Sequence, residues 1–356
     1  MQTPDPESMA MHLGPGQSLA FNIYGTRGKG GAGGSSHGQA PGGQGGPGEG
    51  PTMNNYFTVE QTQDVTSKLK YANNAGMRAS KACLQGTRVE LLARIKNWAL
   101  QDAEHTLLLY GAAGTGKSAI AHTIARHLDF EKLALVPFFA FNRSVQNRSS
   151  SQLIPSWAKV LAEVHPPYQA YLHGLRLSDL ESTDLVHQQD VLFLKGLAKL
   201  TNCGKPVVFI IDALDECPKD ELQDLFCILD KLISEPTLPV LARFLFTYRP
   251  HGEILATFKS AASILHINID DEKETVEDIY KFVTKKLHNT KAQDMAGDVA
   301  KAAQNVFECA AVLCRQLTAP MMNSARQKFI KTLQGGQITS LYGSYHAILE
   351  MHLGGG

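Results

Sequence analysis

The octapeptide Gly111-Ala112-Ala113-Gly114-Thr115-Gly116-Lys117-Ser118 decides the fold of this 356-residue chain. It matches the phosphate-binding pattern G-x-x-x-x-G-K-[ST] at every fixed position. An apolar stretch of strand length, 106–110, precedes it, and a stretch of helix-forming composition, 119–128, follows it. Strand, glycine loop and helix, in this order, are the context in which the pattern forms a phosphate-binding loop.

Each residue type in the loop has a chemical purpose. The glycines allow backbone conformations that are closed to residues with side chains, so successive N–H groups can face one anion. The helix that begins near Lys117 adds the positive end of its dipole. Lys117 can reach the β- and γ-phosphates, and the Ser118 hydroxyl can ligate Mg²⁺. The alternative, a glycine turn that happens to precede a lysine, is disfavoured by the flanking strand and helix. The predicted nucleotide-binding residues are Gly111, Ala112, Ala113, Gly114, Thr115, Gly116, Lys117, Ser118 and Ala119.

The composition argues against several classes of partner. Lys plus Arg number 34 and Asp plus Glu number 34, so neither nucleic acid nor an anionic membrane is indicated. The six cysteines show no zinc-binding spacing, and free thiols fit a reducing cytosol. No secretion signal and no apolar run of membrane-spanning length is found. We therefore expect a cytoplasmic protein without a membrane span.

Composition also predicts how the chain is divided. Half of the residues from Gly25 to Gly50 are glycine, and such a segment cannot bury enough apolar surface to fold. The short alternating patch Leu19 to Tyr24 is either a remnant without function or a docking motif. We expect a disordered arm (1–55), a linker (56–80), a nucleotide-binding domain (81–270), a helical subdomain (271–333) and a C-terminal tail (334–356).

Strands and helices alternate through the predicted nucleotide-binding domain. This alternation predicts an α/β fold, with a parallel sheet flanked by helices on both faces. Beyond Asp270 the pattern is wholly helical, with expected helices at 272–287, 292–317 and 325–333. In the α/β part the expected strands are 106–110, 135–141, 207–211, 243–247 and 264–269, and the expected helices are 89–99, 119–128, 152–164 and 219–234, with 168–200 also mostly helical.

Acidic residues follow the apolar strand 207–211. Asp212 ends the strand and can hold Mg²⁺, while Asp215 or Glu216 could orient or deprotonate an attacking water. The alternative is a solvated acidic loop after a core strand. Arg249 follows the next strand, at the place of a γ-phosphate sensor; its alternative is a surface arginine paired with a carboxylate. The guanine-reading motif N-K-x-D is absent downstream, which favours ATP or ADP.

Three stretches in the right order resemble the NACHT domain, most closely its nephrocystin-like branch, abundant in mushroom-forming fungi. They are Cys83-Leu-Gln-Gly86-Thr87-Arg88, the octapeptide with 119–121, and Phe209-Ile-Ile-Asp212-Ala-Leu-Asp215-Glu216-Cys217. The resemblance covers about residues 80–333.

The resemblance implies a signal-transducing P-loop NTPase of the STAND class, closed with ADP and opened with ATP, and a homo-oligomer on activation. By this resemblance, Lys117 and Ser118 bind phosphate and Mg²⁺, and Asp212 is the Walker B ligand. Asp215 and Glu216 are the distal acidic pair, and Arg249 is the sensor. Thr87 and Arg88 match a segment that lies near the nucleotide in this family. Tyr248 departs from the usual small serine before the arginine, which puts the sensor geometry in question. No recognisable repeat array follows the helical part, as expected of a truncated or degenerate member.

Three functions fit these observations. The first is a slow ATPase that acts as a conformational switch, in fungal innate recognition or programmed cell death. The second is a nucleotide-binding module that does not hydrolyse its ligand. The third, a small-molecule kinase, is disfavoured because two carboxylates stand where a hydrolytic water would sit.

Overall fold

The described part of the chain begins at residue 64. The predicted glycine-rich arm (1–55), with its Leu19–Tyr24 patch, and most of the predicted C-terminal tail lie outside the described residues. The chain divides after Val65, and the candidate site belongs entirely to the second unit, Thr66–Gly356. The computed structural model describes residues 64–336, 342, 343 and 345, with gaps at 102–103, 146–147, 201–202, 235–241, 251–253, 255–257, 259–263 and 321–322.

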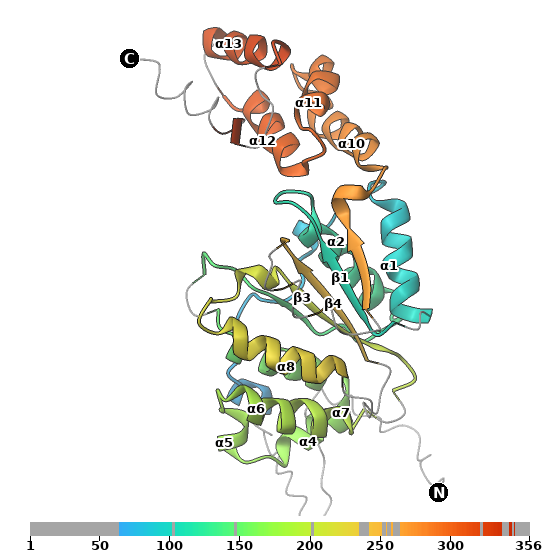
Figure 1. Ribbon diagram of the computed structural model, residues 1–356, viewed down its shortest axis with the longest axis vertical. Coiled ribbons are helices and arrows are strands. Elements are labelled where there is room, and N and C mark those ends of the chain that lie inside the picture. Colours follow the sequence, from blue (N-terminus) through green and yellow to red (C-terminus); the bar gives the residue numbers. More distant parts are fainter. Residues whose placement is uncertain are drawn as a thin grey trace, which may run out of the picture. The chain divides into compact units, whose positions relative to one another are not determined.

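A five-stranded parallel sheet forms the centre of the fold (Figure 1). Its strand order is β2-β3-β4-β1-β5, so β4 lies between the strand before the glycine loop and the strand that ends in Asp212. Because parallel strands end at the same edge, the residues after β1, β3 and β4 are brought together there. The strands are β1 (Thr106–Tyr110), β2 (Phe138–Ala140), β3 (Val207–Asp212), β4 (Ala242–Tyr248) and β5 (Ile264–Asn268).

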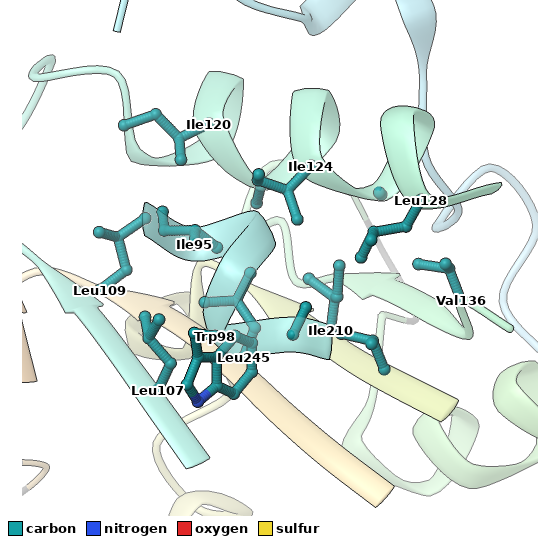
Figure 2. Close-up of a cluster of buried hydrophobic side chains, with 14 of the residues drawn as sticks. Ile95, Trp98, Leu107, Leu109, Ile120, Ile124, Leu128, Val136, Ile210 and Leu245 are labelled. Atoms are coloured by element: carbon teal, nitrogen blue, oxygen red, sulfur yellow. The ribbon is translucent and has the colours of Figure 1, made fainter. Parts of the chain in front are cut away.

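Two helices cover one face of the sheet. Apolar side chains at helical spacing on α1 (Val89–Gln101) and α2 (Lys117–Phe130) pack against alternate residues of the strands, as Figure 2 shows. This packing fixes the start of α2, and with it the glycine loop, against the end of β1. The labelled members of this core are Ile95, Trp98, Leu107, Leu109, Ile120, Ile124, Leu128, Val136, Ile210 and Leu245.

The opposite face is packed by aromatic residues. Trp157 of α3 (Leu153–Val164) and Phe193 lie with their ring centroids 4.8 and 4.9 Å from that of Phe209 on β3. The predicted parallel sheet with helices on both faces is thereby confirmed. The remaining helices of this part are α4 (Pro166–His173), α5 (Leu177–Leu180), α6 (Leu185–Gln188), a π-helix (Gln189–Leu194), α7 (Lys195–Leu197) and α8 (Leu222–Ser234); short 3₁₀ turns lie at Val65–Lys68, Ala79–Lys81, Ser150–Gln152 and Leu214–Glu216.

The part of the expected linker (56–80) that lies in the second unit, residues 66–80, is not a free linker. Its last part packs onto the domain because its backbone groups find partners there. The N–H of Ala140 donates to the carbonyl of Ala75 at 2.8 Å, and the N–H of Arg78 donates to Nδ1 of His122 at 3.1 Å. Composition alone could not show these pairings, since they depend on residues distant in the sequence.

A helical subdomain with its own apolar core follows β5 and the 3₁₀ turn Ile269–Asp271. The helix expected at 292–317 is in fact two helices, because Gln304 and Asn305 take left-handed φ angles of 45° and 65° that end the first. No helix within the described ranges is both long and apolar enough to cross a bilayer. The subdomain consists of α10 (Thr275–Leu287), α11 (Ala296–Ala302), α12 (Phe307–Thr318) and α13 (Asn323–Gln334), with a 3₁₀ turn at Gln293–Met295.

Candidate functional site

The glycine loop joins the end of β1 to the start of α2. Gly114 and Gly116 have φ angles of 76° and 100°, which side-chain-bearing residues rarely adopt, and Gly116 is the N-cap of α2. A Cβ atom on Gly111 would lie 3.1 Å from Oδ1 of Asp270. That carboxylate accepts the N–H of Ala112 at 3.0 and 3.2 Å through its two oxygens. The loop therefore has the backbone form that the sequence predicted, braced by a residue that the sequence did not indicate.

Lys117 is buried and lies over its own loop. Its Nζ donates to the carbonyls of Gly111 at 2.8 Å and Ala112 at 2.7 Å. Among the described residues no carboxylate forms an ion pair with it, so one of its three N–H donors is left for a further acceptor. Burial lowers the pKa of Lys117, and the charge of Asp215 opposes that shift. A buried ammonium held only by neutral carbonyls is well suited to receive an anion.

The two predicted Mg²⁺ ligands lie together. Asp212, at the end of β3, is buried, and the Ser118 side chain lies close enough to its carboxylate to act on its pKa. Thr247 on β4 donates to Oδ1 of Asp212 at 2.6 Å and accepts the N–H of Ala213 at 2.9 Å. Burial raises the pKa of Asp212, and the hydrogen bond from Thr247 and the nearby Ser118 side chain oppose the shift.

The predicted acidic pair and the predicted sensor also meet. The N–H of Arg249 donates to Oδ1 of Asp215 at 3.0 Å, and its guanidinium lies 3.2 Å from Oε1 of Glu216. Oε2 of Glu216 accepts the N–H of Arg143 at 3.2 Å, while the Arg143 guanidinium donates to the carbonyl of Asp215 at 2.5 Å. Both oxygens of Glu216 are thus occupied by protein donors. Sequence reasoning missed Arg143; its place directly after the β2 strand region was the available signal.

The unusual Tyr248 does not enter this cluster. Its side chain is fully buried in the sheet, where its ring stacks on that of Tyr110 of β1 at 5.7 Å between centroids. Successive residues of a strand point to opposite faces, so Thr247 faces Asp212 while Tyr248 fills the far side. The bulk of Tyr248 is therefore accommodated without displacing Arg249 from the carboxylates.

Lys117, Ser118, Asp215, Glu216, Thr247 and Arg249 line a cleft of about 500 Å³, a size that suits a small ligand. Asp212 is buried beneath it and is not part of the lining. The helical subdomain closes it from above, where the N–H of Glu308 donates to the carbonyl of Gly114 at 3.0 Å. Phe307 lies against Gly116, 3.9 Å from the position of an added Cβ. Its ring meets that of Phe282 edge to face at 5.7 Å. The lining includes Gly114, Gly116, Lys117, Ser118, Ala119, Asp215, Glu216, Thr247, Arg249, Phe282, Phe307 and Glu308.

The other predicted loop residues do not line the cleft, and some of them support the residues that do. Gly111 and Ala112 supply the carbonyls that hold Lys117, and Thr115 Oγ1 donates to the carbonyl of Ala112 at 2.9 Å. Ala113 is exposed and is not part of the lining. A neighbouring cavity of about 620 Å³ shares Cys83 with the cleft, but it is lined by α1 and α2 and contains no glycine of the loop, so it is not a phosphate site.

The residues present fit a nucleotide with its metal ion. Within the described ranges no group of three or more His, Cys, Asp or Glu side chains forms a ready metal site. An Mg²⁺ ion would have Ser118 and Asp212 on the protein side and would take its other ligands from phosphates and water, which is the usual arrangement for this ion.

Parts of this chain are similar to known proteins. Residues 86–249 match the family model described as "Nephrocystin 3, N-terminal", whereas no curated protein matches the chain. Similar solved structures include Cdc6p from Pyrobaculum aerophilum, at 14% identity and a TM-score of 0.45 over 68% of this chain and 64% of that chain. A Walker-type ATPase of Pyrococcus abyssi matches at 12% identity and a TM-score of 0.45, over 80% of this chain and 76% of that chain.

The match to Cdc6p spans slightly less than two thirds of that protein's length. The resemblance inferred from three motifs is confirmed by the family model, whose matched range contains the glycine loop, Asp212 and Arg249. The fold of this part, a parallel sheet with the glycine loop between β1 and α2, is that of a P-loop NTPase. Residues 86–249, slightly less than half of the chain, are similar to the nephrocystin 3 N-terminal family.

Proposed function

We propose that this protein is a nucleotide-operated switch of the NACHT and STAND type. It binds ATP or ADP with Mg²⁺ in the cleft and couples the bound nucleotide to the position of the helical subdomain. The observation that carries the proposal is that the glycine loop forms the floor of the cleft while Phe282, Phe307 and Glu308 of the helical subdomain form its roof. A ligand that contacts both parts can shift the equilibrium between their arrangements.

In this proposal the loop binds the phosphates. The N–H groups at the start of α2 and the remaining donor of Lys117 face the β- and γ-phosphates. Ser118 and Asp212 hold Mg²⁺, which neutralises phosphate charge when bound. Asp212 is prepared for this role because the hydrogen bond from Thr247 opposes the effect of burial on its ionisation.

The roof offers an apolar surface to the base. Phe282 and Phe307 present adjoining aromatic rings to the cleft, together with the small side chain of Ala311. Aromatic rings stack favourably on any nucleobase, so this wall supports nucleotide binding in general. The preference for adenine rests on the missing guanine-reading motif in the sequence.

Hydrolysis, in this proposal, is slow. Glu216 is the candidate general base, with Asp215 beside it, but both oxygens of Glu216 accept hydrogen bonds from Arg249 and Arg143. Each of these oxygens keeps a second lone pair for a water, but the two arginine donors hold the carboxylate in an orientation that the water does not set. Arg249 can transfer from Glu216 to a γ-phosphate, and this exchange would let it sense ATP.

The same observation favours a second candidate function. If Glu216 stays bound to its two arginine donors when ATP is present, the protein holds nucleotide without hydrolysing it and acts as a binding module. The two functions share the binding site and differ only in whether Glu216 becomes free.

Nucleotide binding by the full chain tests what both candidates share. Replacing Lys117 with Ala should weaken ATP affinity about 100-fold, equal to about 2.8 kcal/mol, which is within the range for a hydrogen bond to a charged group. The control is Lys219→Ala, at an exposed lysine outside the cleft. Titration calorimetry with ATP and ADP measures both variants. Unchanged affinity in Lys117→Ala would refute nucleotide binding at this loop.

Single-turnover hydrolysis separates the two candidates. For the switch, Glu216→Gln should spare ATP affinity and slow hydrolysis at least tenfold. For the binding module, wild type and variant should both fail to release phosphate. In the switch proposal the protein acts in the cytoplasm, in innate recognition or programmed cell death, and assembles into a homo-oligomer with ATP. Light scattering in the presence of ATP or ADP tests that assembly.

A further inference from the structure

Arg88 is a buried arginine at the junction of several elements. It directly precedes α1, has a left-handed φ angle of 57°, and only 1% of its surface is exposed. Its backbone carbonyl accepts the N–H of Leu92 at 2.8 Å, which begins the helix. Burying a guanidinium costs free energy unless its donors find acceptors. The acceptors that it has found therefore show what this side chain holds together.

The partners of the Arg88 side chain come from the glycine loop and from the helical subdomain. One terminal nitrogen donates to the carbonyl of Thr115 in the loop at 3.1 Å. The other donates to Oγ1 of Thr275, at the start of α10, at 2.7 Å. The Cζ atom of the guanidinium lies over the ring of Phe307, at the start of α12, 5.0 Å from the ring centroid. One side chain thus connects the floor of the cleft to both helices that carry its roof.

The charge of this arginine has no carboxylate paired with it directly among the described residues. Asp278 lies nearby, but its Oδ2 accepts the backbone N–H of Arg88 at 2.7 Å. The guanidinium itself is held by a carbonyl, a hydroxyl and an aromatic ring, all of them neutral. To anchor α10, the Arg88 side chain would only need to pair with Asp278 on that helix. Instead it donates to Thr275 and also reaches the glycine loop at Thr115.

One hydrogen bond shows directly whether the helical subdomain lies on the glycine loop. The N–H of Glu308, in the first turn of α12, has no partner within its own helix and donates instead to the carbonyl of Gly114. This hydrogen bond exists only while α12 lies on the glycine loop. Hydrogen exchange at the Glu308 amide therefore measures how often the subdomain lifts away.

We propose that Arg88 is a positioning residue that latches α10 and α12 onto the glycine loop, so that the cleft opens only when its side chain leaves Thr115 and Thr275. The inference deepens the proposed switch and rests on it for the consequence that the latch slows nucleotide exchange. The latch itself is a property of the protein without nucleotide.

Removing the side chain tests the latch without breaking the bond to Asp278, because that bond uses the backbone. In the full chain without nucleotide, Arg88→Ala should raise exchange at the Glu308 amide about tenfold. Tenfold corresponds to about 1.4 kcal/mol, close to the net value of one hydrogen bond. Release of a fluorescent ADP analogue should accelerate by a similar factor.

Two variants of Thr275, the residue that accepts the hydrogen bond from Arg88, keep the test valid if Arg88→Ala fails to fold. Thr275→Val keeps the shape of the side chain and removes the acceptor hydroxyl, whereas Thr275→Ser keeps the hydroxyl. The valine variant should behave like Arg88→Ala and the serine variant like wild type. Because the two residues share one interaction, the double variant should be no more open than the more open single variant.

The outcomes distinguish the latch from the proposed function. Wild-type exchange at Glu308 in both Arg88→Ala and Thr275→Val would overturn the latch. Loss of ADP affinity in Arg88→Ala with unchanged exchange at Glu308 would also overturn it, because Arg88 would then be a direct ligand. If wild type binds no nucleotide, the proposed function fails, while the exchange measurement still decides the latch.

Discussion

Thr247 and Asp212 connect the ends of two neighbouring strands beneath the cleft: the threonine hydroxyl donates to Oδ1 of the aspartate at 2.6 Å. The same hydroxyl oxygen accepts the N–H of Ala213, whose φ angle of 57° turns the chain away from β3. Thr247 thus fixes both the carboxylate predicted to face Mg²⁺ and the turn that leads to Glu216.

Replacing Thr247 with Val should weaken the contribution of Mg²⁺ to nucleotide binding. Burial already raises the pKa of Asp212, and removing the hydrogen bond that opposes this shift favours the neutral acid, a poor Mg²⁺ ligand. We expect the ratio of ATP affinities with and without Mg²⁺ to fall about tenfold, the effect of roughly one hydrogen bond to a charged group. Thr247→Ser, which keeps the hydroxyl, is the control. An unchanged ratio in the valine variant would contradict this role for Thr247.

The two arginines beside Glu216 should differ in their effect on ATP and ADP. The Arg249 side chain lines the cleft and, in the proposed switch, moves to a γ-phosphate, whereas the Arg143 side chain donates to the backbone carbonyl of Asp215. Arg249→Ala should therefore reduce the preference for ATP over ADP about tenfold while changing ADP affinity little. Arg143→Ala should leave the preference unchanged. Calorimetric titration of both variants with both nucleotides measures it, and an equal loss for ATP and ADP in Arg249→Ala would argue against a sensor.

The sequence was sufficient to predict which residues meet at this edge of the sheet. The loop pattern is local, and Asp212 and Arg249 could be placed because residues that follow parallel strands meet at one edge of the sheet. Thr247 has a weaker signal, since a hydroxyl near the end of a strand is common. Its partnership with Asp212 depends on β4 lying beside β3, an order that the sequence does not show.

The contacts that support the glycine loop, and those that the helical subdomain makes with it, could not be predicted from the sequence. Asp270 reaches Ala112 across 158 positions of sequence, and Phe307 reaches Gly116 only through the packing of the helical subdomain. Arg88 was identified as part of a motif near the nucleotide, but its bond to Thr275 depends on where α10 begins. These contacts follow from long-range packing, which local patterns do not encode.

Acid should destabilise the domain through His122. Burial lowers the pKa of this histidine to about 4, and the charges of Lys81 and Arg78 act in the same direction. The folded state therefore binds its proton less well than the unfolded chain, whose histidine has a pKa of about 6.5. The stabilising contribution is complete above pH 6.5 and is lost as the pH falls toward 4, about 2 kcal/mol at pH 5.

Denaturant unfolding at pH 7 and pH 5 measures this contribution. His122→Asn, which offers an acceptor to Arg78 and does not titrate, should lose less stability between the two pH values than wild type. The control is His173→Asn, at an exposed histidine. Equal losses in His122→Asn and wild type would show that other groups cause the acid sensitivity.

A glycine near the π-helix should resist replacement, unlike a glycine in the helical subdomain. A Cβ on Gly196 would lie 2.7 Å from Cε2 of Tyr168, a fully buried ring whose hydroxyl donates to the carbonyl of Leu192 at 2.6 Å. Because that hydrogen bond anchors the ring, we expect Gly196→Ala to destabilise the protein by about 1–3 kcal/mol. Nothing lies within 4 Å of a Cβ on Gly297, inside α11, so Gly297→Ala should be neutral or stabilise by up to about 1 kcal/mol through helix propensity. Urea unfolding compares the two variants. Equal midpoints for Gly196→Ala and Gly297→Ala would mean that the Tyr168 ring moves to make room for the added methyl group.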